Sequence, residues 1–137
     1  MRDVLFVCSD NCCRSIMAEA LLNHLGKGKY NAFSAGCKPA TSIQPETLEI
    51  LKRNYIPWGK PRSKSWNEYA ARPFNLVISL CKDISEESWP IFPGKPQRIL
   101  WDIPRPGVDT ESKSDTTFER VFQHIKEKIE KLMRGQY

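Results

Sequence analysis

The stretch FVCSDNCCRS, residues 6–15, decides how the rest of this chain is to be interpreted. It begins inside a short apolar run, Val4–Val7, of the kind found in central parallel strands that are buried on both faces. Apolar residues then recur at helical spacing from Ser15 to Leu25. Between the two predicted elements lies a short loop that starts at Cys8 and reaches Arg14 six residues later. We therefore predict a strand, a tight loop and a helix in direct succession.

Such a loop is where open α/β sheets bind ligands. Its backbone N–H groups and the N-terminus of the following helix can form a concavity that binds a tetrahedral oxyanion. The same field would lower the pKa of Cys8 and make it an in-line nucleophile, while the Arg14 guanidinium holds two oxyanion oxygens. Ser15 can donate to the Cys8 sulfur when that sulfur leaves, and Asn11 tolerates a left-handed turn. The predicted oxyanion-binding residues are Ser9, Asp10, Asn11, Cys12, Cys13 and Arg14.

Each residue alone has a plainer explanation, because a cysteine at the end of a strand is often just buried and an arginine is often just solvated. The arrangement Cys-x5-Arg-Ser at a strand-to-helix junction favours the oxyanion loop, because that chemistry needs all its parts at this spacing.

Strands and helices alternate along the rest of the sequence. This order predicts one α/β domain over residues 1–137, with a four-stranded parallel sheet, helices on both faces and right-handed crossovers. Segments 57–73 and 83–97 are rich in Pro, Lys and Ser and are predicted to be long loops. The predicted strands are 4–7, 29–36, 74–81 and 97–103, and the predicted helices are 15–25, 43–54 and 116–133.

Composition narrows the class of protein. The chain has 137 residues, of which 40% are hydrophobic and 27% charged, as expected for one globular domain. No apolar run has the length of a membrane span, and the N-terminal apolar run is too short for a signal peptide, so we expect a cytoplasmic monomer without a membrane partner. The net charge of +5 suits an anionic partner or simply solubility, and its scattered basic residues without a motif argue against nucleic acid.

The five cysteines also point to a cytoplasmic protein. Their number is odd, and Cys12 and Cys13 are adjacent, which suits neither a disulfide framework nor a zinc site. We therefore expect free thiols and no bound metal.

The segment VCSDNCCRSIMAEALL, residues 7–22, resembles the signature C-x-x-N-x-C-R-S-x-x-A-E of the low-molecular-weight tyrosine phosphatase fold. FSAG, residues 33–36, is similar to the second strand and turn of that family. The resemblance extends over essentially the whole chain. It implies one of two activities, the hydrolysis of phosphomonoesters or the reduction of arsenate.

Three stretches resemble the arsenate reductases more than the phosphatases. Met17 stands before Ala18-Glu19, where reductases commonly read RSQMAE and phosphatases RSPxAE. Cys81 follows a strong predicted strand, where the reductases have a second redox cysteine. LWDIPRPG, residues 100–107, is similar to the reductases' WDxPDP segment, and no Asp-Pro-aromatic motif of the phosphatases appears.

The resemblance therefore implies an arsenate reductase that binds arsenate or phosphate, with Cys81 as resolving thiol, no bound cofactor and an external thiol reductant. A tyrosine phosphatase, a hydrolase in which Cys81 has no role, is the alternative. A third possibility is an oxyanion-binding module without turnover.

Two departures from the family affect the mechanism. Thioredoxin-linked reductases carry a third cysteine soon after the second, but this region has Ser88 and no cysteine. The donor is thus glutathione with glutaredoxin, or thioredoxin, and the redox partners left open within the chain are Cys12, Cys13 and Cys37.

The second departure is Arg105, which stands where the family has its general acid. We assign the acid role to Asp102, whose alternative is a turn or capping residue, and Asp109 is a remoter candidate.

A third departure concerns a cation. Some reductases of this family bind potassium beside the loop, and Asn11, Glu19 and Ser34 match three of the four ligands. Lys64 falls at or near the fourth, an aspartate. We expect its ammonium group to replace the cation and pair with Glu19, the alternative being a solvated loop lysine.

Overall fold

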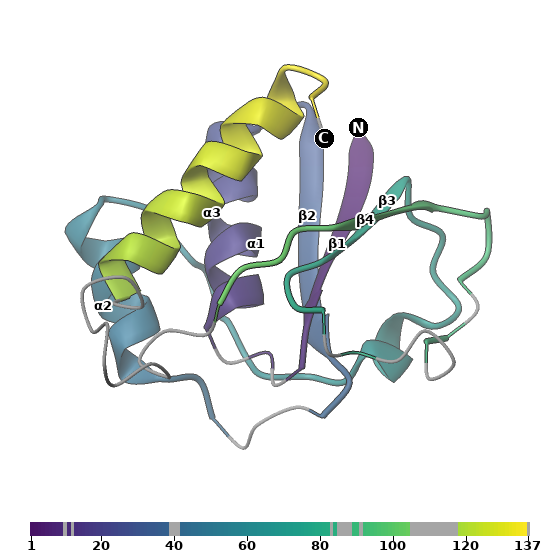
Figure 1. The fold of residues 1–137 in the computed structure, drawn as a ribbon, viewed down its shortest axis with the longest axis horizontal. Helices are drawn as coiled ribbons and strands as arrows, with labels where there is room; N and C mark the ends of the chain where they lie inside the picture. The colour runs from purple at the N-terminus through teal and green to yellow at the C-terminus, as the bar shows by residue number, and fades with distance from the viewer. Residues whose placement is uncertain are drawn as a thin grey trace.

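The computed structural model describes residues 1–9, 11, 13–38, 42–82, 84, 89–90, 92–104 and 118–136. Strands and helices alternate through most of this part of the chain (Figure 1). The elements are β1 (Arg2–Cys8), α1 (Arg14–Leu25), β2 (Tyr30–Gly36), α2 (Pro45–Arg53), the 3-10 helix η1 (Trp66–Tyr69), β3 (Leu76–Ser79), β4 (Gln97–Leu100) and α3 (Phe118–Met133).

The four strands form one parallel sheet in the order β2-β1-β3-β4. β1 is central, and it pairs Cys8 with Gly36 of β2 and Val7 with Ser79 of β3. The chain that follows β1 therefore leaves the sheet between two neighbours that also end there. This is the position at which ligands bind in open α/β sheets.

The two faces of the sheet are covered differently. α1 packs against α3 and α2, and all three contribute to the cluster that buries Val4 and Phe6 of β1 (Figure 1). Leu5 and Val7 point to the other face, where η1 and its flanking loops supply an aromatic cluster. The rings that line this second face are Phe33, Trp66, Tyr69, Phe74, Trp89 and Phe92.

The predicted four-stranded parallel α/β fold is confirmed. The expectation of helices on both faces holds only in part, because α1, α2 and α3 all pack on one face and the described helix on the other is the short η1. Helix α1 begins one residue before the predicted position, and Gly26 stands at its C-terminal end. Within the predicted loop 57–73 the structure adds η1, whose Ser65 cap accepts the Asn67 N–H through its hydroxyl. A helix of four residues is too short to produce a hydrophobic period.

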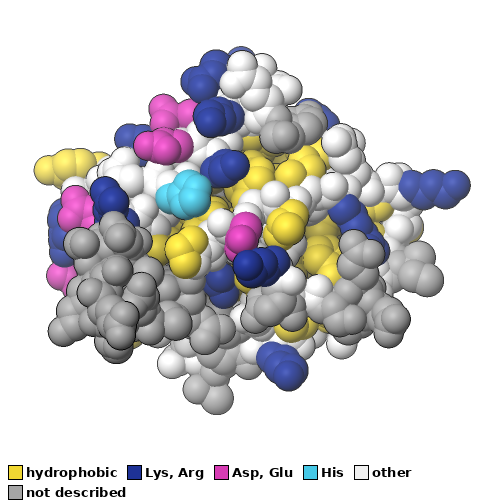
Figure 2. Space-filling model, viewed as in Figure 1, with side chains coloured by type: hydrophobic (Ala, Val, Ile, Leu, Met, Phe, Trp, Pro, Cys, Tyr) yellow, Lys and Arg dark blue, Asp and Glu magenta, His cyan; other side chains and the backbone are white. Residues whose placement is uncertain are grey.

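The basic side chains are scattered over the surface, as they are along the sequence. On the described part of the face in Figure 2, Lys and Arg side chains are spread among polar and hydrophobic ones rather than gathered in one patch. Among the described residues, no helix combines the length and apolar character that a membrane span needs.

Candidate active site

The sulfur of Cys8 lies at the end of β1 and is fully buried. The Asn11 N–H donates a hydrogen bond to this sulfur at 3.2 Å, and the Ser15 hydroxyl lies 2.9 Å from it. The Ser15 oxygen also accepts a hydrogen bond from Asn11 Nδ2 at 2.7 Å. Because that bond occupies the oxygen as an acceptor, the hydroxyl hydrogen is available to point at the sulfur.

Asn11 has the predicted left-handed backbone conformation, with φ of 50°. This turn brings its N–H round to Cys8 while its side chain reaches away from the sulfur. The side-chain Oδ1 accepts the Lys64 N–H at 2.9 Å, and Asn11 is fully buried. One residue thus connects the loop, the start of α1 and a segment more than fifty residues further along the chain.

Arg14 is the first residue of α1, and only 4% of it is exposed. Its Nη1 donates to the Ile103 carbonyl at 2.9 Å, which directs the guanidinium across the end of the sheet. Its Nε is buried and has no hydrogen-bond partner in the described part of the chain. A buried donor without an acceptor is costly, so the arrangement suits an anion that would supply the missing acceptor.

Gly36 supports the loop from the neighbouring strand. A Cβ at this position would lie 2.8 Å from the Ser9 carbonyl oxygen and 2.9 Å from that of Cys8. The Lys38 N–H then donates to the same Ser9 oxygen at 2.8 Å. Only glycine allows β2 to approach the loop this closely, because the atoms it would meet belong to the backbone.

Cys81 follows β3 at the same end of the sheet as Cys8. The Leu80 N–H donates to the Val7 carbonyl at 2.8 Å, so the chain keeps its register with β1 up to the residue before Cys81. Cys81 is 5% exposed and belongs to the same helix-side cluster as Cys8. It also lines a cavity of about 220 Å³ together with Lys82, Trp89 and others.

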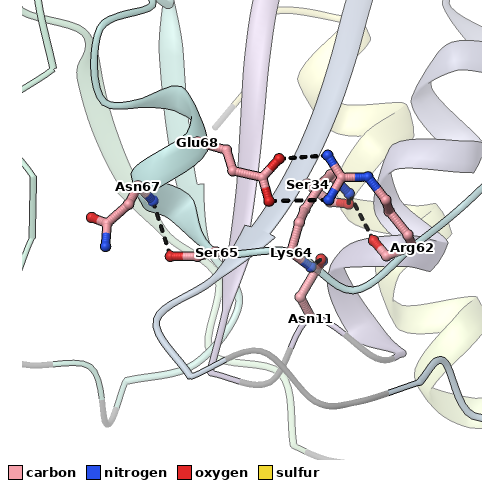
Figure 3. A network of polar contacts seen from close by, with 7 residues as sticks. All are labelled: Asn11, Ser34, Arg62, Lys64, Ser65, Asn67 and Glu68. Carbon is pink, nitrogen blue, oxygen red and sulfur yellow. Dashed lines mark hydrogen bonds and ion pairs between the residues drawn. The ribbon is translucent and has the colours of Figure 1, made fainter.

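A buried polar group lies beside the loop (Figure 3). The Lys64 ammonium donates to Ser34 Oγ at 3.3 Å and to the Arg62 carbonyl at 3.0 Å, and Ser34 donates to Glu19 Oε1 at 2.9 Å. Burial lowers the pKa of Lys64 and raises that of Glu19, while their mutual attraction opposes both shifts. The alternative of a solvated loop lysine is thus excluded, since Lys64 is 7% exposed, and the expected contact with Glu19 runs through Ser34.

Comparison with known proteins agrees with this geometry. The family model of the low molecular weight phosphotyrosine protein phosphatases matches residues 3–136. The chain belongs to this family.

Among its relatives, an arsenate reductase of Staphylococcus aureus (strain N315) is 30% identical over 131 residues, which cover 95% of each chain. A solved arsenate reductase in its phosphate binding state is 27% identical, with a TM-score of 0.79 and full coverage of both chains. A thioredoxin-dependent arsenate reductase of Corynebacterium glutamicum is 28% identical with a TM-score of 0.78, and 61% of that chain is covered.

Not every predicted residue of this phosphatase-family site is brought together. The Asp102 side chain is 55% exposed and its carboxylate lies 3.8 Å from Lys82 Nζ, so its nearest described charge is that lysine. Cys13 is buried directly before α1, and Cys37 packs half-buried on the aromatic face. Asp10, Cys12, Ser88, Arg105 and Asp109, which the sequence also singled out, lie outside the described residues.

The sequence could not reveal every part of the site. The contact of Arg14 with Ile103 uses a main-chain carbonyl, which carries no side-chain signal. The close approach at Gly36 did have a signal, because a glycine directly after a strand often marks a tight backbone contact. Among the described residues, no group of three His, Cys, Asp or Glu side chains could hold a metal ion.

Proposed function

We propose that this member of the family is a thiol-dependent arsenate reductase in which Cys8 attacks arsenate and Cys81 resolves the adduct. The observation that carries the proposal is the position of the two cysteines, which follow neighbouring parallel strands at one end of the sheet and belong to one buried cluster. Hydrolysis of a phosphate ester needs only Cys8. A second buried thiol at the same edge is what a two-electron reduction requires.

In the first step the Cys8 thiolate attacks arsenic, an As–O bond breaks, and the oxygen leaves as water after protonation. The Asn11 N–H and the Ser15 hydroxyl, both at the sulfur, favour its ionised form. The unpartnered Arg14 Nε and the N-terminus of α1 bind the oxyanion oxygens and the charge that develops on them.

In the second step the Cys81 thiolate attacks the Cys8 sulfur, and a disulfide forms. The S–As bond breaks with its electron pair passing to arsenic, so arsenic(V) leaves as arsenite and two thiolates have become one disulfide. An external thiol then reduces this disulfide and supplies the two electrons. Thioredoxin fits the named Corynebacterium relative. The cavity at Cys81, with Lys82 and Arg98 in its lining, also suits an anionic low-molecular-weight thiol such as glutathione.

Asp102 remains the proposed donor of the proton to the departing oxygen. Its support is indirect, because the neighbouring Ile103 carbonyl binds Arg14 and so brings this segment to the loop. In the structure its carboxylate lies 3.8 Å from Lys82 Nζ. Loss of such a proton donor costs a factor of about 10² to 10⁴ in rate.

A phosphatase is the second candidate, because Cys8, Arg14 and Ser15 would serve phosphoryl transfer equally well. In that case a phosphocysteine forms at Cys8 and water hydrolyses it. Cys81 would then be dispensable.

The test is arsenite production by wild type, Cys8→Ser and Cys81→Ser, assayed once with thioredoxin and once with glutathione plus glutaredoxin. We expect turnover in wild type with at least one donor and none in either variant. Full activity of Cys81→Ser with a donor that supports wild type would refute the resolving role. Steady hydrolysis of an aryl phosphate that survives Cys81→Ser, without arsenite from any donor, would favour the phosphatase.

A further inference from the structure

Lys64 is a buried charged residue that the proposed reaction does not use. Its ammonium is held by Ser34 Oγ and by the Arg62 carbonyl, and Ser34 in turn bonds Glu19. A buried ammonium is expensive unless it is paired and hydrogen-bonded. These hydrogen bonds offset part of the desolvation cost of the ammonium. A charge kept in such a place can serve a neighbouring group.

The main chain of Lys64 is tied to the loop at Asn11, which lies beside it in Figure 3, and to the end of β2 at Gly36. Its N–H donates to Asn11 Oδ1 at 2.9 Å, and its carbonyl accepts the Gly36 N–H, also at 2.9 Å. Asn11 is the residue whose N–H reaches the Cys8 sulfur. The ammonium group is therefore carried by a segment that is fixed, through two hydrogen bonds, to the atoms around the nucleophile.

We propose that Lys64 is a positioning residue for Cys8: its buried ammonium is a counter-charge for the sulfur, and its main chain holds Asn11 against it. The proposal deepens the proposed function, since it rests on Cys8 being the nucleophile. It assigns Lys64 no contact with the substrate.

The electrostatic part of the proposal follows because two charges affect each other's pKa reciprocally. A negative sulfur at Cys8 raises the pKa of Lys64, and the same attraction must favour the ionised sulfur when Lys64 is charged. Glu19 on α1 acts in the opposite sense, because its carboxylate, joined to Lys64 through Ser34, offsets part of the positive charge of the ammonium. Arg62 and Glu68 also face Lys64, but they form a two-pronged ion pair with each other, so their fields largely cancel.

The remaining charged or titratable neighbours do not change the direction in which Lys64 shifts the pKa of Cys8. Arg14 is present beside the loop in every variant and so does not enter the difference between them. Tyr69 of η1, whose pKa burial raises, is neutral at physiological pH. The net effect of Lys64 on Cys8 is therefore set by the ammonium against the Glu19 carboxylate.

The experiment measures the rate at which iodoacetamide alkylates Cys8 in the full chain as a function of pH, with the Cys8 peptide quantified by mass spectrometry. Lys64→Met removes the charge and keeps both main-chain hydrogen bonds. We expect its alkylation midpoint to rise by about one pH unit. Lys60→Met removes one positive charge from an exposed position four residues earlier in the chain and should leave the midpoint unchanged.

Glu19→Gln should shift the alkylation midpoint of Cys8 in the opposite direction. Removing the carboxylate leaves the ammonium unopposed, so the alkylation midpoint of Cys8 should fall. A merely structural role would disturb the loop in both variants and move the midpoint in one direction. If Lys64→Met folds poorly, Lys64→Gln, which removes the charge but keeps a hydrogen-bond donor, should show the same upward shift of the midpoint.

Chemical rescue gives an independent readout. In Lys64→Ala, added ethylammonium should fill the vacated site and lower the Cys8 midpoint again, whereas tetramethylammonium, which has no N–H to donate, should not. An unchanged midpoint in Lys64→Met and in Glu19→Gln would overturn the proposal. Because alkylation needs no arsenate, shifted midpoints without arsenite production would refute the proposed function and leave the role of Lys64 standing.

Discussion

At the residue scale, Asn11 shows why the loop needs one side chain rather than another. Its φ of 50° would suit glycine as well, since both residues tolerate the left-handed region. Glycine, however, could neither accept from Lys64 nor donate to Ser15. An aspartate could accept but not donate, and it would place a negative charge beside the sulfur. Asparagine meets the backbone and hydrogen-bonding demands together.

The Glu19–Lys64 pair leads to a stability prediction at the same scale. Removing one partner leaves a buried charge without its counter-charge, whereas removing both leaves none. We expect Glu19→Gln and Lys64→Met each to lower the free energy of unfolding, and the double variant to lose less than the sum of the two by about 1–3 kcal/mol. Urea denaturation of the four proteins at pH 7 measures this coupling.

The coupling should depend on pH with a definite sign. Burial raises the pKa of Glu19, so its contribution to stability is largest below the unfolded value of 4.5 and is lost as pH rises through the folded pKa. Lys64 limits that loss by attracting the ionised carboxylate. The destabilisation by Lys64→Met should therefore shrink as the pH is lowered and Glu19 takes up its proton. A cost that is constant with pH would contradict this.

At the scale of elements, the end of β2 forms one wall of the loop. Gly36→Ala would place a methyl group against the carbonyl oxygens of Ser9 and Cys8 and 3.0 Å from the Asn11 nitrogen. We expect the loop to shift, with a loss of about 1–3 kcal/mol in the free energy of unfolding and a clear rise in KM for arsenate. Thermal unfolding and steady-state kinetics check the two effects.

The control is Gly59→Ala. Gly59 has φ of +64° and no atom within contact range of a new Cβ, so alanine there costs about 1–2 kcal/mol through the backbone alone. It should lower stability without changing KM. Equal effects of the two substitutions on KM would mean that the close approach of β2 is not what shapes the loop.

The elements also show what a sequence can and cannot predict. α1 could be located because a segment rich in apolar residues, from Ile16 to Leu25, ends at Gly26, and the loop before it because Cys8, Arg14 and Ser15 lie within one short stretch. η1 could not be located, because four residues are too few to show a pattern of apolar residues. The hydrogen bond between Asn11 and Lys64 spans 53 positions, and its donor is the main-chain N–H of Lys64. The sequence could not predict this bond, although the side chain of Lys64 did point to the site.

At the scale of the whole molecule, alternating strands and helices predicted a parallel sheet but not which strands are neighbours. The order β2-β1-β3-β4 depends on which faces α1, α2 and α3 cover, and that is decided by packing between segments far apart in the chain. The order matters for function. It makes β1 and β3 neighbours and so carries Cys8 and Cys81 to the same edge.

This arrangement predicts the outcome of a single turnover. With excess arsenate and no reductant, each chain should release about one arsenite and stop, because the oxidation of two thiols to one disulfide supplies only two electrons. The sequence has five cysteines and two enter that disulfide, so three should remain titratable after denaturation. Peptide mapping should find Cys8 joined to Cys81.

The matched control is Cys81→Ser, which keeps the Cys8 sulfur and removes the proposed second thiol. It should release no arsenite in this experiment, and all four of its cysteines should remain titratable once arsenate is removed, because the adduct at Cys8 cannot advance to a disulfide. A disulfide from Cys8 to Cys12, Cys13 or Cys37 in wild type would show that another of the five cysteines is the resolving thiol. In that case Cys81 would lie at the same edge of the sheet as Cys8 but would not be the resolving thiol.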